Sequence, residues 1–335
     1  METNFKKEIA SNLRGFFVTQ IISMIVRNNI IYKVLSKDKF RLNDFDICKN
    51  KKNLNFIFNY LTNIGYLKKN KHFFSLTELG KDIFMRYSSF LVPHSYKNYF
   101  SNLDNLILKK KNNIKVLRDE NILGSGKTHM RYFFSALNYL KKENNFSSLI
   151  DLGVGNGDFA ILSKKILKLK KICGVDFSSE SVKISKKKIE KLKIKNLIIK
   201  EDAKKIEKWS KKIIKFTDNQ EILISMWFLI QEISSNSKST IINFLNKLKK
   251  NFPKAKIILC ELVKADAVTY SLNKDFTFMP EYMLFHDLSG QGVFGYRDLE
   301  YIVKKSNFKI EKRIIFDELK ANEKSIPSCV TYILK

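Results

Sequence analysis

The second half of the chain alternates short apolar runs with longer amphipathic stretches. Apolar runs typical of buried strands occupy residues 149–152, 171–175, 197–199, 221–227 and 257–262, and two further strands are expected over 308–311 and 328–334. Between them, apolar residues three or four positions apart predict helices over 159–169, 179–192 and 296–303. This order predicts an α/β domain in which helices join successive strands.

The first 105 residues have a different pattern, in which helices dominate. A broad apolar face predicts a helix from Phe16 through Ile30, and a second helix over 53–64 ends at Gly65. Residues 66–76 predict a hairpin with a polar turn, and Thr77 is placed to cap the next helix. Together these elements predict a winged helix, a module that can bind DNA or join subunits.

Three of the twelve glycines lie within five positions, at Gly153, Gly155 and Gly157, directly after the apolar run that contains Asp151. Glycine is favoured where the backbone turns tightly or lies against a ligand, so we expect a strand-to-helix turn that holds a nucleotide-like ligand. Asp176 follows the next strand, where a carboxylate can bind ribose hydroxyls. These features fit a nicotinamide enzyme, a nucleoside-based methyl donor, or a tight turn with no ligand.

The order of these motifs over about residues 128–335 resembles the class I S-adenosylmethionine-dependent methyltransferases. The resemblance implies a Rossmann-like, seven-stranded domain whose last two strands form an antiparallel edge. It also implies that the glycines approach the methionyl part, Asp151 holds its amine and Asp176 binds the ribose. The resemblance further implies that Asp202 binds the adenine, with Phe177 and Ala203 nearby. Ser225 and Trp227 would close the pocket.

The turn Leu76-Thr77-Glu78-Leu79-Gly80 resembles the end of the N-terminal dimerisation domain of small-molecule O-methyltransferases. The resemblance implies a homodimer and favours subunit contact over DNA binding for the winged helix. The expected domains are a mostly helical winged-helix dimerisation domain over 1–105, a helical linker that lines the pocket over 106–140, and the methyltransferase domain over 141–335.

The expected substrate site contains no histidine after the fourth strand, where plant-type O-methyltransferases have a base; Gln231 and Glu232 stand there. These two residues and the segment 285–292 resemble the α-keto acid C-methyltransferases, a group that includes 2-ketoarginine methyltransferase. The resemblance implies an enolate stabilised by a divalent or ferric metal ion near His286 and Gln231. The third ligand would be Asp287, Glu232, Glu261 or another histidine. The alternatives are O-methylation with His286 as general base, or a buried structural histidine.

The formal net charge of +29 is compatible with nucleic-acid binding, but 54 of the 62 basic residues are lysines spread over many expected helix faces. We therefore expect solvated surface and a small-molecule substrate. The four cysteines are scattered singly, without metal-binding spacing, as in a reducing compartment. No run of about eighteen apolar residues and no signal-peptide core are evident, so a cytoplasmic protein without membrane contact is expected.

Overall fold

A computed structural model describes residues 2–108, 114–143, 146–218, 221–234, 237–273, 277–321 and 325–335. The chain forms two compact units, Met1–Thr128 and His129–Lys335. The boundary between them falls inside the segment 106–140, which the sequence predicts to connect two domains. Each unit has a buried apolar core of its own.

The first unit is mostly helical and contains one small hairpin. Its elements are α1 (Glu2–Arg27), α2 (Ile30–Ser36), the 3₁₀ helix η1 (Leu42–Asp44), α3 (Lys51–Asn63), β1 (Leu67–Asn70), β2 (Phe73–Leu76), α4 (Glu78–Met85), α5 (Ser88–Ser95), α6 (Lys97–Phe100), α7 (Leu103–Leu108) and α8 (Arg118–Thr128).

Local sequence signals explain the centre of this unit. Gly65 lies between the end of α3 and the antiparallel hairpin β1–β2. Its φ of +82° is the left-handed conformation that commonly follows the end of a helix. Thr77 Oγ1 accepts a hydrogen bond of 2.9 Å from the backbone N–H of Gly80 and so caps α4. Aromatic rings packed at centroid separations of 5.2 to 6.3 Å fill the core, namely Phe40, Phe45, Phe58 and Phe74. The predicted winged helix is confirmed.

The first helix differs from the prediction at both ends. It begins at Glu2 rather than near Phe16 and ends at Arg27, because Asn29 adopts a left-handed conformation with a φ of +57° before α2 begins. The N-terminal half exposes apolar side chains at helical spacing, Phe5, Ile9, Leu13, Phe16 and Phe17. The C-terminal half is buried in the core of the unit, as at Ile22 and Ile25.

A stretch within α1, Phe5–Arg27, is long and apolar enough to cross a membrane, with a hydropathy of 1.4. Polar residues interrupt this stretch, so it is not the unbroken apolar run whose absence the sequence analysis noted. Core helices of soluble proteins pass the same test, and this one lies partly in the core of its unit. Length and hydropathy alone do not assign it to a membrane.

The second unit is built on a seven-stranded sheet with the strand order β5-β4-β3-β6-β7-β9-β8. Five strands are parallel and the pairs β7–β9 and β8–β9 are antiparallel. The strands are β3 (Ser148–Leu152), β4 (Lys171–Asp176), β5 (Lys195–Lys200), β6 (Ile222–Trp227), β7 (Lys256–Leu262), β8 (Ile310–Leu319) and β9 (Ile326–Leu334). The predicted seven strands and antiparallel edge are confirmed.

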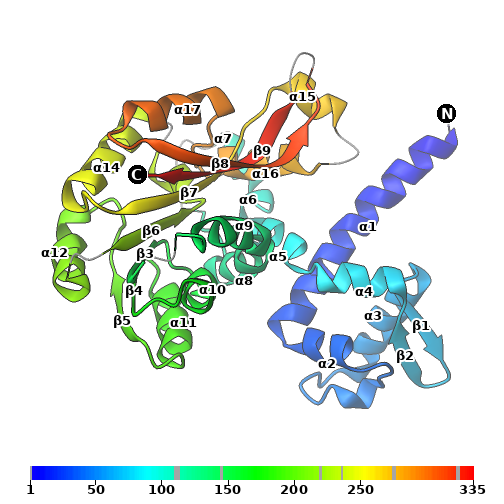
Figure 1. Ribbon diagram of the computed structural model, residues 1–335. Helices are drawn as coiled ribbons and strands as arrows, with labels where there is room; N and C mark the ends of the chain where they lie inside the picture. The colour runs from blue at the N-terminus through cyan, green and yellow to red at the C-terminus, as the bar shows by residue number, and fades with distance from the viewer. Residues whose placement is uncertain are drawn as a thin grey trace. The chain divides into compact units, whose positions relative to one another are not determined.

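Helices cover both faces of this sheet (Figure 1). One core lies between the sheet and α12, α14 and α17, and another between the sheet and α9, α10 and α11. The helices of the unit are α9 (Met130–Leu140), α10 (Asp158–Leu167), α11 (Ser179–Glu190), α12 (Ile206–Thr217), α13 (Ile230–Ile233), α14 (Lys238–Asn251), α15 (Ala267–Leu272), α16 (Met279–Leu288) and α17 (Tyr296–Lys305).

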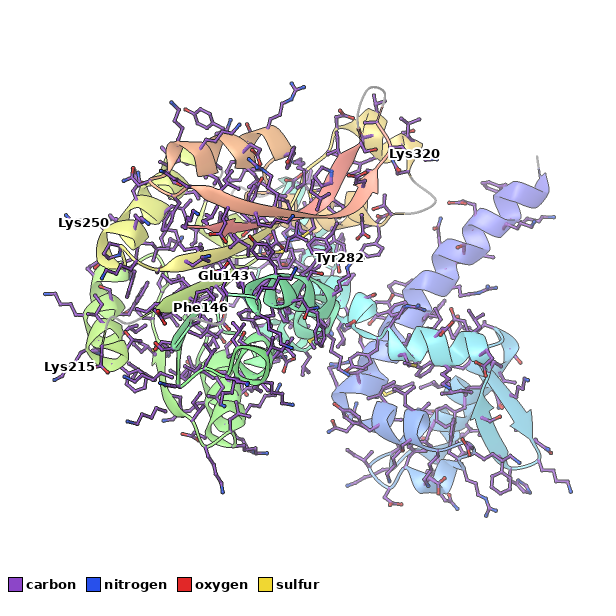
Figure 2. The ribbon with its side chains drawn as sticks, in the orientation of Figure 1. Glu143, Phe146, Lys215, Lys250, Tyr282 and Lys320 are labelled. Atoms are coloured by element: carbon purple, nitrogen blue, oxygen red, sulfur yellow. The ribbon has the colours of Figure 1, made fainter. Side chains whose placement is uncertain are left out.

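The lysines lie on the outer surfaces of these elements. Lys215 on α12, Lys250 on α14 and Lys320 after β8 are all exposed, and their side chains extend away from the sheet (Figure 2). These positions agree with the expectation that the lysines lie on solvent-exposed surface around the unit.

Candidate active site

The glycine turn connects β3 to α10 at the C-terminal edge of the parallel strands. Gly153, Gly155 and Gly157 have φ values of +74°, +52° and +78°, a region that residues with a Cβ rarely adopt. A Cβ on Gly157 would lie 3.3 Å from Ser185 Cβ on α11. A Cβ on Gly155 would meet only a backbone oxygen of the turn, at 3.8 Å. Gly157 therefore serves packing, while the space beside Gly155 is open to a ligand.

Asp151 is buried on β3 directly opposite Ser225 on β6. Ser225 Oγ donates a hydrogen bond of 2.6 Å to Asp151 Oδ1. Burial raises the pKa of Asp151 to about 7, and the hydrogen bond from Ser225 opposes this rise. A buried carboxylate that titrates near neutral pH can bind a cationic group such as an amine, and the hydrogen bond from Ser225 orients this carboxylate.

Asp176 ends β4 and faces the glycine turn. Its Oδ2 accepts a hydrogen bond of 3.0 Å from the N–H of Gly155, and its Oδ1 accepts one of 2.9 Å from the N–H of Ser178. Burial raises the pKa of Asp176, while these two hydrogen bonds oppose the rise. The next residue, Phe177, is 51% exposed. A carboxylate beside an exposed aromatic ring suits the ribose and base of a nucleoside.

Asp202 and Ala203 follow β5, which pairs with β4. Asp202 is half-buried and its Oδ1 accepts a hydrogen bond of 2.9 Å from the N–H of Lys204, whereas Ala203 is buried. The N–H of Glu201 donates a hydrogen bond of 3.0 Å to the carbonyl of Asp176. The strand ends that carry Asp176 and Asp202 therefore lie side by side, as a nucleoside site needs.

Trp227 is the last residue of β6 and packs between two rings. Its ring centroid lies 4.5 Å from that of Phe133 and 4.8 Å from that of Phe159. Trp227 Nε1 is buried and has no hydrogen-bond partner in the described part of the chain. Phe228, the next residue, has a φ of +53°, which is uncommon for a residue with a Cβ. Strained backbone of this kind concentrates at functional sites.

The short helix α13 carries Gln231 and Glu232 just beyond β6. It is held at its start by Glu261 at the end of β7, whose buried Oε1 accepts a hydrogen bond of 2.7 Å from the N–H of Ile230. Burial raises the pKa of Glu261 to about 8, while backbone hydrogen bonds from α13 oppose the rise. Glu261 thus fixes the position of the helix that presents Gln231 and Glu232.

This helix contacts both the glycine turn and the segment after α16. A Cβ on Gly153 would lie 3.4 Å from Leu229 Cδ1, just before α13. On the other side, the N–H of Gly292 donates a hydrogen bond of 2.9 Å to the carbonyl of Gln231. The structure therefore brings Gln231 and Glu232 to the boundary between the expected cofactor site and the expected acceptor site.

His286 is buried on α16, the helix that also carries Tyr282, labelled in Figure 2. His286 Nδ1 lies 2.5 Å from the carbonyl oxygen of Tyr282, so Nδ1 carries the proton and the lone pair of the neutral ring is on Nε2. Burial lowers the pKa of His286, although the contact with Tyr282 and the charge of Glu232 oppose the change. The imidazole is neutral at neutral pH and can accept a proton at Nε2.

Glu232 is within electrostatic range of three other site residues. Its charge raises the pKa of Asp176, of Glu261 and of His286. The N–H of Gln291 also donates a hydrogen bond of 2.9 Å to the carbonyl of His286, next to the contact between Gly292 and α13. The three residues predicted for catalysis, His286, Gln231 and Glu232, are thus gathered in one acidic region.

The described residues contain no group of three or more His, Cys, Asp or Glu side chains that could hold a metal ion. Asp287, one of the candidate third ligands, forms an ion pair with Lys264, whose Nζ lies 3.0 Å from Asp287 Oδ2. Glu261 is occupied by the backbone of α13. Of the candidate third ligands for the predicted pair His286 and Gln231, Asp287 and Glu261 thus have other partners, whereas Glu232 lies within electrostatic range of His286.

Comparison with known proteins agrees with both units. The family model of the AprA winged helix domain matches residues 14–110. No curated protein sequence matches the chain. A candidate O-methyltransferase from Nostoc punctiforme is 12% identical, with 98% of each chain covered and a TM-score of 0.66.

Two further solved structures match over the same extent. Human N-acetylserotonin methyltransferase in complex with SAM is 11% identical, with 98% of this chain and 97% of that chain covered and a TM-score of 0.63. A dimethyltransferase of 8-amino-8-demethyl-D-riboflavin from Streptomyces davawensis is 10% identical, with 98% of each chain covered and a TM-score of 0.58.

At such identities the likeness establishes the fold. The chain has the fold of the class I O-methyltransferases that carry an N-terminal winged-helix domain. These comparisons do not confirm the resemblance to α-keto acid C-methyltransferases.

Proposed function

We propose that this protein is an S-adenosylmethionine-dependent methyltransferase that methylates a hydroxyl group of a small molecule, with His286 as general base. One observation carries the proposal. His286 is buried and neutral, its Nδ1 proton is fixed on the Tyr282 carbonyl, and Glu232, whose charge acts on it, lies on α13, which begins just after Leu229 beside the glycine turn. A base oriented in this way beside a nucleoside site suits proton removal from an acceptor hydroxyl.

The residues in and beside the glycine turn fit the methyl donor. Asp176 would bind the ribose hydroxyls, Asp151 would hold the amine, and Gly155 would allow the methionyl part to lie against the backbone. Phe177 and Asp202 would face the adenine, and the complex of one structural neighbour with SAM supports this choice of cofactor. The buried carboxylates also suit a ligand that carries positive charge.

When bound, S-adenosylmethionine supplies a sulfonium methyl group that an oxygen nucleophile can attack in line. His286 Nε2 takes the hydroxyl proton as the oxygen–methyl bond forms and the sulfur–methyl bond breaks, and it later returns that proton to solvent. Glu232 stabilises the imidazolium, because its charge raises the pKa of His286. Much of the rate would come from holding acceptor and donor in line, which Glu261 supports by fixing α13.

A second candidate is C-methylation beside the ketone of an α-keto acid through a metal-stabilised enolate. The observation in its favour is that the backbone carbonyls of His286 and Gln231 accept hydrogen bonds from the adjacent N–H groups of Gln291 and Gly292. The charge of Glu232 opposes it, since the keto acid would bring a further negative charge to this region. We rank it second.

We also propose that the protein is a homodimer. The exposed apolar stripe on the N-terminal half of α1 supports this, as does the winged-helix domain in the structural neighbours. Solvated lysines support a small molecule rather than nucleic acid as the partner. A cytoplasmic location without membrane insertion is consistent with this proposal.

The test is to incubate the full-length protein with S-adenosylmethionine and two acceptor panels, phenols and α-keto acids, each with and without a chelator. We expect O-methyl products that are insensitive to the chelator, identified by mass spectrometry. C-methylated keto acids that form only with added metal would instead establish the second candidate. No methyl transfer to any acceptor, with the cofactor bound, would contradict both.

A further inference from the structure

Gln231 presents a buried amide oxygen that nothing in the described part of the chain satisfies. Its side chain is only 9% exposed, and its Oε1 has no hydrogen-bond partner among the described residues. Leaving a buried acceptor unpaired costs about 1–3 kcal/mol, so such a group is expected to meet a partner when the site is in use. An amide cannot act as a base at neutral pH, so its role is recognition.

The position of Gln231 restricts what that partner is. Its backbone carbonyl accepts the N–H of Gly292, and the adjoining N–H of Gln291 donates to the carbonyl of His286. The main chain of Gln231 therefore lies beside the segment that follows the helix of the proposed base. A ligand at the junction of these two segments would therefore meet residues of both α13 and α16.

The surrounding charges and rings define the chemistry further. The charge of Glu232 acts on His286 and Glu261, which disfavours an anionic group on the acceptor. Along α16, ring centroids lie 5.1 Å apart for Phe278 and Tyr282, 4.8 Å for Tyr282 and Phe285, and 4.7 Å for Phe285 and His286. A row of aromatic rings that ends at the base suits a flat aromatic acceptor.

We infer that Gln231 determines specificity for an aromatic acceptor that carries a second O–H or N–H donor next to the hydroxyl to be methylated. The neighbouring group donates its hydrogen to Gln231 Oε1, while the reacting hydroxyl gives its proton to His286 Nε2. This inference rests on the proposed function and names the substrate class of the same site. A singly methylated catechol would be a poor substrate, because its ether oxygen cannot donate.

The experiment compares catechol and 2-aminophenol with 2-methoxyphenol and phenol as acceptors. It uses the full-length wild-type protein and two variants of similar side-chain size, Gln231→Glu and Gln231→Met. Glutamate keeps an acceptor oxygen, whereas methionine removes it. The readouts are kcat/KM for each acceptor, the separate kcat and KM values, and the affinity for S-adenosylmethionine by calorimetry.

We expect the wild type to prefer catechol over 2-methoxyphenol by about 10- to 100-fold in kcat/KM. Gln231→Met should abolish this preference through a higher KM for catechol, Gln231→Glu should retain it, and cofactor affinity should not change. A wild type without the preference, or Gln231→Met that keeps it, would overturn the inference. Methylation of phenol but of neither catechol nor 2-aminophenol would overturn the proposed class of acceptor. If the cofactor binds and no hydroxyl acceptor reacts, the proposed function itself fails.

Discussion

Ser225 Oγ lies 2.6 Å from Asp151 Oδ1 and donates a hydrogen bond to it across the directly paired strands β3 and β6. The carboxyl is buried beside the glycine turn, and burial raises its pKa to about 7. Its charge therefore changes within the range of ordinary assays. If Asp151 holds the amine of the methyl donor, as proposed, this contact influences the affinity for that ligand.

The affinity for S-adenosylmethionine should increase between about pH 6 and pH 8, because only the ionised form of Asp151 attracts the amine. Asp151→Asn should remove most of this increase and weaken binding by about 10- to 100-fold at the higher pH. Calorimetric titration across the pH range is the measurement. Affinity that does not vary with pH in the wild type would contradict the assignment of Asp151.

The same pKa shift predicts how the unliganded protein responds to pH. Folded Asp151 binds more protons than the unfolded chain between about pH 4 and pH 7, so its contribution to stability falls as the pH rises through this window. Ser225→Ala removes a hydrogen bond that lowers the pKa of Asp151, so the window should extend to higher pH. Chemical denaturation of both proteins at several pH values measures the effect.

Gly157 and Gly155 form a matched pair for separating packing from ligand binding. Gly157→Ala combines a φ of +78° with a contact of 3.3 Å to Ser185, and should destabilise the protein by about 1–3 kcal/mol. Gly155→Ala meets no neighbouring side chain, so it should cost less stability but weaken cofactor binding, because its methyl group enters the ligand space. Thermal unfolding and calorimetry together test this; equal effects of the two variants on both quantities would count against it.

The sequence was sufficient for the elements with strong local signals. The glycine turn, the strand that ends at Asp176 and the Thr77 cap all follow from residue types with few alternative conformations. The start of α1 was placed too late because its first turns are polar, although Phe5, Ile9 and Leu13 recur every four residues and could have indicated it.

Long-range relationships in the site could not be read from the chain. His286 and Gln231 are 55 positions apart, and only the folded arrangement of α13 and the segment after α16 brings them together. Glu261 was considered as a metal ligand, but it holds the backbone of α13. The left-handed conformation of Phe228 has no sequence signal, since phenylalanine rarely adopts it.

Glu261 should be a positioning residue whose role depends on its acceptor oxygens. Glu261→Gln keeps one carbonyl oxygen for the N–H of Ile230, whereas Glu261→Leu leaves buried N–H groups without a partner and should cost about 1–3 kcal/mol. We expect Glu261→Leu to lower kcat while leaving the affinity for S-adenosylmethionine close to wild type. Rescue of both stability and kcat by Glu261→Gln is the specific outcome; a glutamine variant as impaired as the leucine variant would argue against the role.

The exposed stripe on α1 should mediate dimer formation. Leu13 and Phe16 are 56% and 61% exposed, and Leu13→Glu combined with Phe16→Glu should convert the dimer to a monomer in light scattering. Leu272→Glu is the control, because Leu272 is 53% exposed in the second unit. A monomeric wild type, or one that binds neutral lipid vesicles through this helix, would contradict the proposed interface.

The most direct measurement concerns the proton that His286 removes. It compares methyl transfer to phenol and to 4-nitrophenol, whose hydroxyl is largely ionised at neutral pH, by wild type and His286→Ala. If His286 is the base, the variant should lose about 100- to 10,000-fold in kcat/KM for phenol and much less for 4-nitrophenol. The wild-type rate with phenol should also fall as the pH drops through the lowered pKa of His286. An equal loss for both acceptors would contradict a base role for His286 and the mechanism built on it.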